Sequence, residues 1–285
     1  MSGAGQNQGM KKTPLAFAWV ATVLVLLATA VTLFFGQDYF YERLKIAVDG
    51  GSTAGVVVSV IIPIIAVIMI IIVWVIVWVQ YEKQRTKEFK QVAEEMGFSF
   101  YPKGDDMQLR IGVTARLSDF HLFSQGRSRK IRNMLHGVSE QLEVGILGYR
   151  YTTGGGRSSH TVRQSVIYFR SPELNLPQFA LRPEYLFHKI GSALGYQDID
   201  FESDQTGVEF SKKYLLQGKD EQKVRELFTP EVLGFFGGQY GVSTEGGGDQ
   251  LIFYRRRRRI KPEDVRPFME EGLRVFRLFA SSQPS

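Results

Sequence analysis

Two uncharged apolar segments dominate the first part of the chain. Pro14–Phe35 and Ala54–Val79 carry no charged side chain and are dense in Val, Ile, Leu and Ala. A helix needs about 20 apolar residues to cross the hydrocarbon core of a bilayer, so both segments are long enough. The pattern predicts an N-terminal transmembrane hairpin, in which the two helices are joined by an external loop over residues 36–53.

Details within the two segments support this interpretation. Pro63 falls inside the second one and predicts a kink. Trp74 and Trp78 are four residues apart near its end, on one helical face, as is typical of aromatic residues at a membrane interface. Ala28-Thr29-Ala30 has the small-residue pattern of a signal-peptide cleavage site. The apolar run continues to Phe35, however, which favours an uncleaved helix.

The basic residues beside these segments predict the orientation. The tail, residues 1–13, carries Lys11 and Lys12, and the stretch after the second segment carries four more basic residues: Lys83, Arg85, Lys87 and Lys90. The connecting loop has two, Arg43 and Lys45. Because positive charge is retained on the cytoplasmic side, both termini are expected in the cytoplasm.

The pattern changes after the second apolar segment. Residues 80–97 predict a juxtamembrane helix, with apolar positions at helical spacing and Gly97 as the stop. Residues 98–285 mix short strand and helix patterns. We expect an α+β region of small antiparallel sheets and helices, as one domain or as two halves (98–191 and 192–285). The predicted strands are Phe98–Tyr101, Ile131–His136, Leu142–Tyr151, Thr161–Arg170, Gln178–Leu181, Asp198–Glu202, Val208–Leu216, Tyr240–Thr244 and Leu251–Arg259. The predicted helices open at Arg182-Pro183-Glu184, after Asp220, after Thr229 and at Pro262.

One hairpin is predicted with particular clarity. Leu142–Tyr151 and Thr161–Arg170 are rich in Val, Ile, Tyr and Phe, and they bracket a loop with three consecutive glycines at 154–156. Such a pattern indicates two antiparallel strands with an exposed turn. Ile131–His136 and Gln178–Leu181 are expected to flank this pair.

Five consecutive arginines, Arg255 to Arg259, are the strongest local charge signal. Side chains on a strand alternate between its two faces, so this run is too charged for a buried sheet centre. One interpretation is a solvated edge strand that charge protects against aggregation. The other is a contact with an anionic surface, above all lipid headgroups. A second basic cluster could extend that surface: Arg127, Arg129, Lys130 and Arg132.

Other candidate chemistry is sparse. The chain has no cysteine, which excludes disulfides, Cys-ligated metals and thiol nucleophiles, and its net charge of +6 suits work beside anionic lipid. Asp198, Asp200 and Glu202 would share a strand face, but no further ligands for a metal converge in the sequence. The four histidines, which lack metal-ligand spacing, are His121, His136, His160 and His188. The glycine triplets at 154–156 and 246–248 lack the residues of a phosphate-binding loop, so no cofactor, metal or catalytic residue is predicted.

Three short motifs carry a resemblance to known proteins: Arg132–Gly137, Tyr149–Gly154 and Leu176–Glu184. Through them the chain resembles a widespread family of uncharacterised bacterial membrane proteins with two N-terminal helices and a cytosolic α+β region. The resemblance implies a multi-pass protein of the bacterial inner membrane. It implies no activity, because the motifs are strand and turn signatures.

These patterns predict a non-enzymatic, membrane-anchored interaction module. Its expected partners are the lipid bilayer and either another protein, a second copy of the chain or the anionic membrane surface. Nucleic acid is not expected, because no binding module for it is present. The alternative is a membrane-tethered enzyme that acts on a lipid or a peptide through residues which only the fold brings together.

Overall fold

The computed structural model describes residue 45 and residues 62–104, 112–184, 195–201 and 205–282. The chain divides into two compact units, Met1–Arg85 and Thr86–Ser285. The first predicted transmembrane segment, Pro14–Phe35, lies outside the described residues, as does nearly all of the external loop. The two-helix hairpin therefore stays a prediction.

The helix α3 (Ile62–Glu95) includes most of the second apolar segment and continues into the predicted juxtamembrane helix. Within it, Val67–Glu95 is long and apolar enough to cross a membrane, with a mean hydropathy of 1.6 over its most apolar part. None of that part is buried inside the protein. Large exposed apolar surfaces need a cover, so α3 is a candidate membrane-spanning helix.

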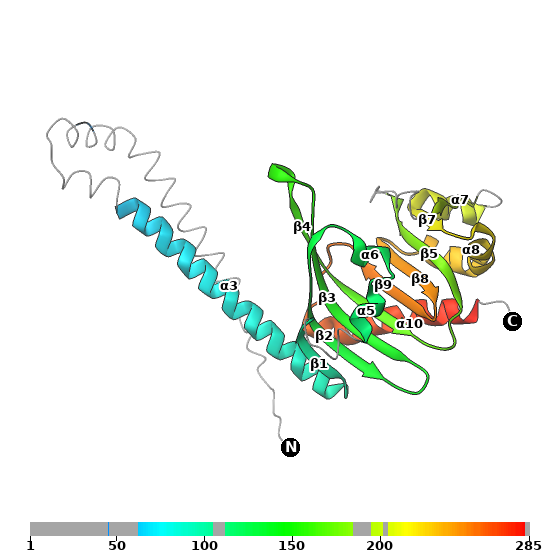
Figure 1. The fold of residues 1–285 in the computed structure, drawn as a ribbon, viewed down its shortest axis with the longest axis horizontal. Helices are drawn as coiled ribbons and strands as arrows, with labels where there is room; N and C mark the ends of the chain where they lie inside the picture. The colour runs from blue at the N-terminus through cyan, green and yellow to red at the C-terminus, as the bar shows by residue number, and fades with distance from the viewer. Residues whose placement is uncertain (1–44, 46–61, 105–111, 185–194, 202–204, 283–285) are drawn as a thin grey trace, which may run out of the picture. The chain divides into compact units, whose positions relative to one another are not determined.

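The second unit is an α+β structure built on one large antiparallel sheet (Figure 1). In the described residues the strand order is β1-β2-β3-β4-β9-β8-β5-β7-β6. The prediction of several small sheets is wrong, because β8 and β9 insert between β4 and β5 and join both halves of the region. The strands are β1 (Ser99–Lys103), β2 (Arg127–Val138), β3 (Glu143–Thr153), β4 (His160–Arg170), β5 (Leu176–Pro183), β6 (Gln197–Asp198), β7 (Tyr214–Gly218), β8 (Val242–Gly248) and β9 (Gln250–Arg255).

The predicted hairpin is confirmed. β3 and β4 pair without interruption from Glu143 opposite Arg170 to Thr153 opposite His160. A short 3-10 turn, Gly156–Ser158, closes the connection, and the described side chains between the strands are exposed. Of the two expected flanking strands, β2 does pair with β3. β5, however, pairs with β7 and β8, because β9 occupies the place beside β4.

Helices cover both faces of the sheet. One face packs against α7 (Gln205–Lys213), α8 (Glu221–Leu227), α9 (Pro230–Gly237) and α10 (Val265–Ser281). The core there is rich in phenylalanine; Phe179, for example, contacts both Phe228 and Phe279. The opposite face is covered by the short helices α5 (Val113–Leu117) and α6 (His121–Ser124), over a core that includes Tyr149, Tyr168 and Tyr254. Burial of the two apolar faces is the main stabilising term of this unit.

Three helix starts follow their sequence signals. Asp220 accepts a hydrogen bond from the Lys223 backbone N–H at the start of α8, and Thr229 does the same for Val232 at the start of α9. A 3-10 turn that begins at Pro262 leads into α10. These caps were predictable because they depend on neighbours within four residues.

Two other local predictions are wrong in part. Val208 and Phe210 belong to α7, and the strand begins only at Tyr214. The rings of Phe210 and Tyr214 stack across this boundary, with centroids at 5.7 Å. Arg182 and Pro183 still belong to the strand β5, and helical backbone begins only at Glu184, which lies in a 3-10 turn. Residues 185–194, the rest of that predicted helix, lie outside the described residues.

Gly246 is expected to tolerate no side chain. A Cβ atom there would lie 2.4 Å from Cε1 of Phe179 and 2.9 Å from Cδ1 of Leu176. Both neighbours are buried, so neither can move aside freely. Gly246→Ala should lower the free energy of unfolding by about 1–3 kcal/mol, the usual cost of overpacking a core. Gly234, around which a Cβ would meet nothing within 4 Å, is the matched control in thermal unfolding experiments.

Candidate functional site: a basic face at one end of the sheet

Basic side chains line up across three neighbouring strands. Lys130 on β2 lies opposite Arg150 on β3, and Arg150 lies opposite Arg163 on β4. Residues directly opposite one another in an antiparallel sheet point to the same face, so the three form one cross-strand row. Like charges in such positions are destabilising. The arrangement therefore costs folding free energy unless an anion compensates it.

Two residues of the predicted basic cluster extend this row. Arg132 is two residues from Lys130 on the same strand and shares its face, opposite Gly148. Arg127 lies opposite Thr152, and its guanidinium donates to the Gly154 carbonyl oxygen at 2.6 Å. We call Arg127, Lys130, Arg132, Arg150 and Arg163 the basic face.

Arg129, the fourth member of the predicted cluster, does not join the basic face. Its guanidinium donates to the carbonyl oxygen of Phe123, at 2.7 Å, on the opposite side of the sheet. Phe123 in turn packs on Tyr149, in the core beneath α5 and α6. Alternation along β2 therefore divides the cluster between the two faces.

Acidic residues are absent from the sequence around the basic face. No Asp or Glu occurs in residues 126–139, 144–172 or 250–262, the segments that hold β2, β4, β9 and nearly all of β3. The carboxylates stand at the other end of these strands, where Glu143 pairs with Arg116 at 2.8 Å and Asp249 pairs with Arg170 at 2.6 Å. Ion pairs thus neutralise one end of these strands, whereas the strand segments at the other end contribute basic residues and no acid.

The structure corrects the prediction for the five arginines. β9 ends at Arg255 and lies between β4 and β8, so the run is not an edge strand. The chain turns sharply because Arg257 adopts a positive φ of 62°. The resulting loop is fixed to β4: the Ser165 N–H donates to the Arg258 carbonyl oxygen at 2.8 Å, and the Arg257 N–H donates to Gln164 Oε1 at 3.3 Å.

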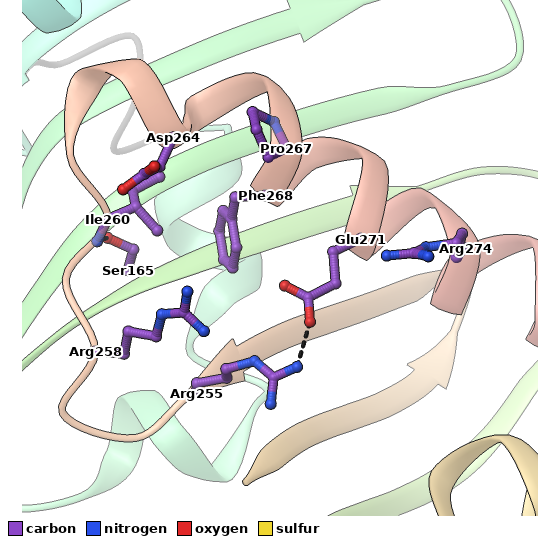
Figure 2. Close-up of a pocket in the computed structure, with 9 residues that line it drawn as sticks. All are labelled: Ser165, Arg255, Arg258, Ile260, Asp264, Pro267, Phe268, Glu271 and Arg274. Atoms are coloured by element: carbon purple, nitrogen blue, oxygen red, sulfur yellow. Dashed lines mark hydrogen bonds and ion pairs between the residues drawn. The ribbon is translucent and has the colours of Figure 1, made fainter. Parts of the chain in front are cut away.

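The five side chains have different environments as a result. Arg255 is bound to Glu271 (Figure 2). It also donates to the Tyr240 carbonyl oxygen. Arg256 is half-buried and hydrogen-bonds Tyr151, whose pKa is raised by burial despite this contact. The remaining three are exposed: Arg257, Arg258 and Arg259. The loop that carries these three arginines is hydrogen-bonded to Gln164 and Ser165 of β4. It therefore lies beside the part of β4 that holds Arg163 of the basic face.

A second polar cluster is buried on the α5–α6 side. Glu245, 2% exposed, accepts hydrogen bonds from the Leu122 N–H and the Tyr254 hydroxyl, both at 3.2 Å. Burial raises the pKa of Glu245, and the nearby Arg182 guanidinium opposes that shift. Arg182, 6% exposed, also donates to Gln217 Oε1 at 2.9 Å. These contacts satisfy the carboxylate internally, which indicates a structural role for it.

His121 lies beside this buried cluster, and it should make the fold sensitive to acid. Burial, with repulsion by Arg182, lowers the pKa of His121 to about 4 from its ordinary value of 6.5. The unfolded chain therefore binds a proton between these values that the folded chain does not, so stability falls as the pH drops from about 6.5 to 4. Glu245 acts in the opposite direction, because its pKa is raised.

We therefore expect the stability of the wild type and of His121→Gln to depend differently on pH. His121→Gln should lose less stability than the wild type between pH 6.5 and 4, as measured by thermal unfolding. His160→Gln, at an exposed position at the start of β4, is the control and should follow the wild type. Identical pH profiles for wild type and His121→Gln would contradict the assignment.

Three further features were predicted: the interface tryptophans, a strand face with three acids, and histidines without metal-ligand spacing. Trp74 and Trp78 are exposed on α3, at 40% and 49%. β6 ends at Asp198, so the expected strand face shared with Asp200 is not formed, and Glu202 lies outside the described residues, as does His188. Over the part of the chain that the structure describes, no group of three or more His, Cys, Asp or Glu could hold a metal ion.

Comparisons with known proteins add a fold likeness and no family. The chain matches no protein-family model and no curated protein. The resemblance drawn from the three motifs therefore remains an expectation. Among solved structures, the chain is similar to the mycobacterial trehalose monomycolate transport factor A, at 12% identity and a TM-score of 0.47. The match covers 69% of this chain and 93% of that one.

Proposed function

We propose that this protein is a membrane-anchored module that binds the anionic surface of the membrane through its basic face. The observation that carries the proposal is the cross-strand row of Lys130, Arg150 and Arg163. A row that places like charges directly opposite one another, on strand segments without an acidic residue, is suited to an external anion. An anionic leaflet supplies such charges over an area as extended as the sheet itself.

The candidate membrane-spanning helix supports lipid as the partner. α3 continues from the first unit into the second, so a membrane that α3 spans would tether the second unit to the bilayer. A tether raises the effective concentration of a weak surface contact. A basic residue close to an anionic leaflet contributes about 1 kcal/mol, so the three residues of the row together contribute about 3 kcal/mol. The predicted topology, with two helices and cytoplasmic termini, completes the proposal because the cytoplasmic leaflet carries the anionic lipid.

The test uses the full chain held in nanodiscs of phosphatidylcholine, which has no net charge. Binding in trans is measured by co-sedimentation with separate vesicles of phosphatidylcholine alone or with added phosphatidylglycerol. We expect binding to the anionic vesicles only, with a loss of affinity as salt shortens the Debye length from about 10 Å at 0.1 M to about 3 Å at 1 M. Equal binding to both vesicles would refute the proposal, and so would preference for a nucleic-acid competitor over the anionic vesicles.

A further inference from the structure

A pocket of about 240 Å³ lies between the loop after β9 and one face of α10. In Figure 2 the guanidinium groups of Arg255, Arg258 and Arg274 point toward the space beside Phe268 and Glu271. Phe268, Glu271 and Arg274 follow one another at intervals of three residues, so they share a face of the helix. The pocket thus combines two arginines from the loop region with one from α10.

The charges in this pocket are incompletely balanced. Glu271 is bound to Arg255. Arg258 and Arg274 form no ion pair with another described residue, and the buried Nε of Arg255 has no hydrogen-bond partner among the described residues. The second acid of the pocket, Asp264, accepts a hydrogen bond from the Lys261 N–H at 3.3 Å and lies away from Arg274 in this view. Three cations therefore face two anions, one of which is already paired.

The backbone of the loop that carries Arg258 is held in place before any ligand binds. Arg258 is fixed by the hydrogen bond between its carbonyl oxygen and the Ser165 N–H, and by its own N–H, which donates to the Arg255 carbonyl oxygen at 3.2 Å. Ser165 Oγ accepts from the Ile260 N–H at 3.1 Å, which leaves its hydroxyl hydrogen available as a donor. Such preorganisation reduces the entropy cost of binding.

We propose that this pocket binds a phosphomonoester group. The guanidinium groups of Arg258, from the loop, and Arg274, from α10, each present several donors, which suits the oxygens of a phosphoryl group better than the two oxygens of a planar carboxylate. A phosphomonoester is nearly dianionic at neutral pH, which matches the two arginines that lack an acidic partner among the described residues. The inference deepens the proposed function and rests on it in part: the ligand is the headgroup of a phosphomonoester lipid or a free phosphate ester.

Calorimetry on the full chain in phosphatidylcholine nanodiscs tests this site. The probes are glycerol 3-phosphate and short-chain phosphatidic acid, with short-chain phosphatidylglycerol as the phosphodiester comparison. Both phosphomonoesters should bind more tightly than the phosphodiester, and Arg258→Gln and Arg274→Gln should each weaken them by about tenfold or more. Arg277→Gln removes an exposed charge from the same helix outside the pocket and should change the affinity by less than about twofold.

The outcomes separate the two ligand sources and the two proposals. Tighter binding of phosphatidic acid than of glycerol 3-phosphate identifies the lipid headgroup, and equal binding identifies a free phosphate ester. No binding, equal affinity for the phosphodiester, or equal weakening by Arg277→Gln and Arg274→Gln would overturn the site. Continued sedimentation with phosphatidylglycerol vesicles in that case would leave the basic face intact as the membrane contact, so the two failures are distinguishable.

Discussion

Glu245→Ala should lower the free energy of unfolding of the second unit by about 3–5 kcal/mol, the typical cost of removing one partner of a buried charged pair. The carboxylate accepts from the Leu122 N–H and the Tyr254 hydroxyl and faces the buried Arg182. Its removal leaves two donors without an acceptor and a guanidinium without its counter-charge. Hydrogen exchange of the amides in β5, β8 and β9 is a suitable measurement, because all three tryptophans precede Thr86 and so lie outside this unit.

Two companion variants separate the charge from the hydrogen bonds. Glu245→Gln keeps an acceptor oxygen and should cost less than Glu245→Ala. Replacing both partners, Glu245→Leu with Arg182→Leu, should cost less than the sum of the two single changes, because neither charge is then left alone. A loss below about 1 kcal/mol for Glu245→Ala would contradict a structural role, since a buried hydrogen bond alone is worth about that much.

Changing Lys130, Arg150 and Arg163 together to glutamine should weaken binding to anionic vesicles by about 100-fold at low salt. Three contributions of about 1 kcal/mol give about 3 kcal/mol, and each factor of ten corresponds to about 1.4 kcal/mol. The same variant should be at least as stable as the wild type, because it removes repulsion between directly opposite charges. Lower affinity for anionic vesicles together with unchanged or higher folding stability would show that these charges serve binding and not the fold.

The matched control changes an equal number of exposed lysines away from the basic face: Lys212, Lys219 and Lys223. These lie on α7, after β7 and on α8, so the net charge falls by the same amount. Co-sedimentation of the control variant should stay close to that of the wild type at every salt concentration. Equal losses in the two triple variants would show that only net charge matters and that the basic face is not a site.

The sequence by itself determined features that depend on near neighbours. The apolar run of α3, the caps at Asp220 and Thr229, and the β3–β4 hairpin all follow from composition or spacing within a short window. The hairpin was predictable because its two strands are joined directly by a glycine-rich turn. The basic character of Arg127–Arg132 and Arg255–Arg259 was visible as well, as dense positive charge in a short stretch.

Only the tertiary structure decided which of those charges act together. Arg150 and Arg163 drew no attention in the sequence, because an isolated arginine within a strand pattern has no local signal; pairing with Lys130 made them a row. Arg129 lies on the opposite face of the sheet and is not part of the row. Arg255 forms an ion pair with Glu271 of α10. The edge-strand prediction for the arginine run failed because β9 inserts between β4 and β8. Strand order depends on contacts between residues far apart in the chain, and those contacts depend on which apolar faces bury one another best.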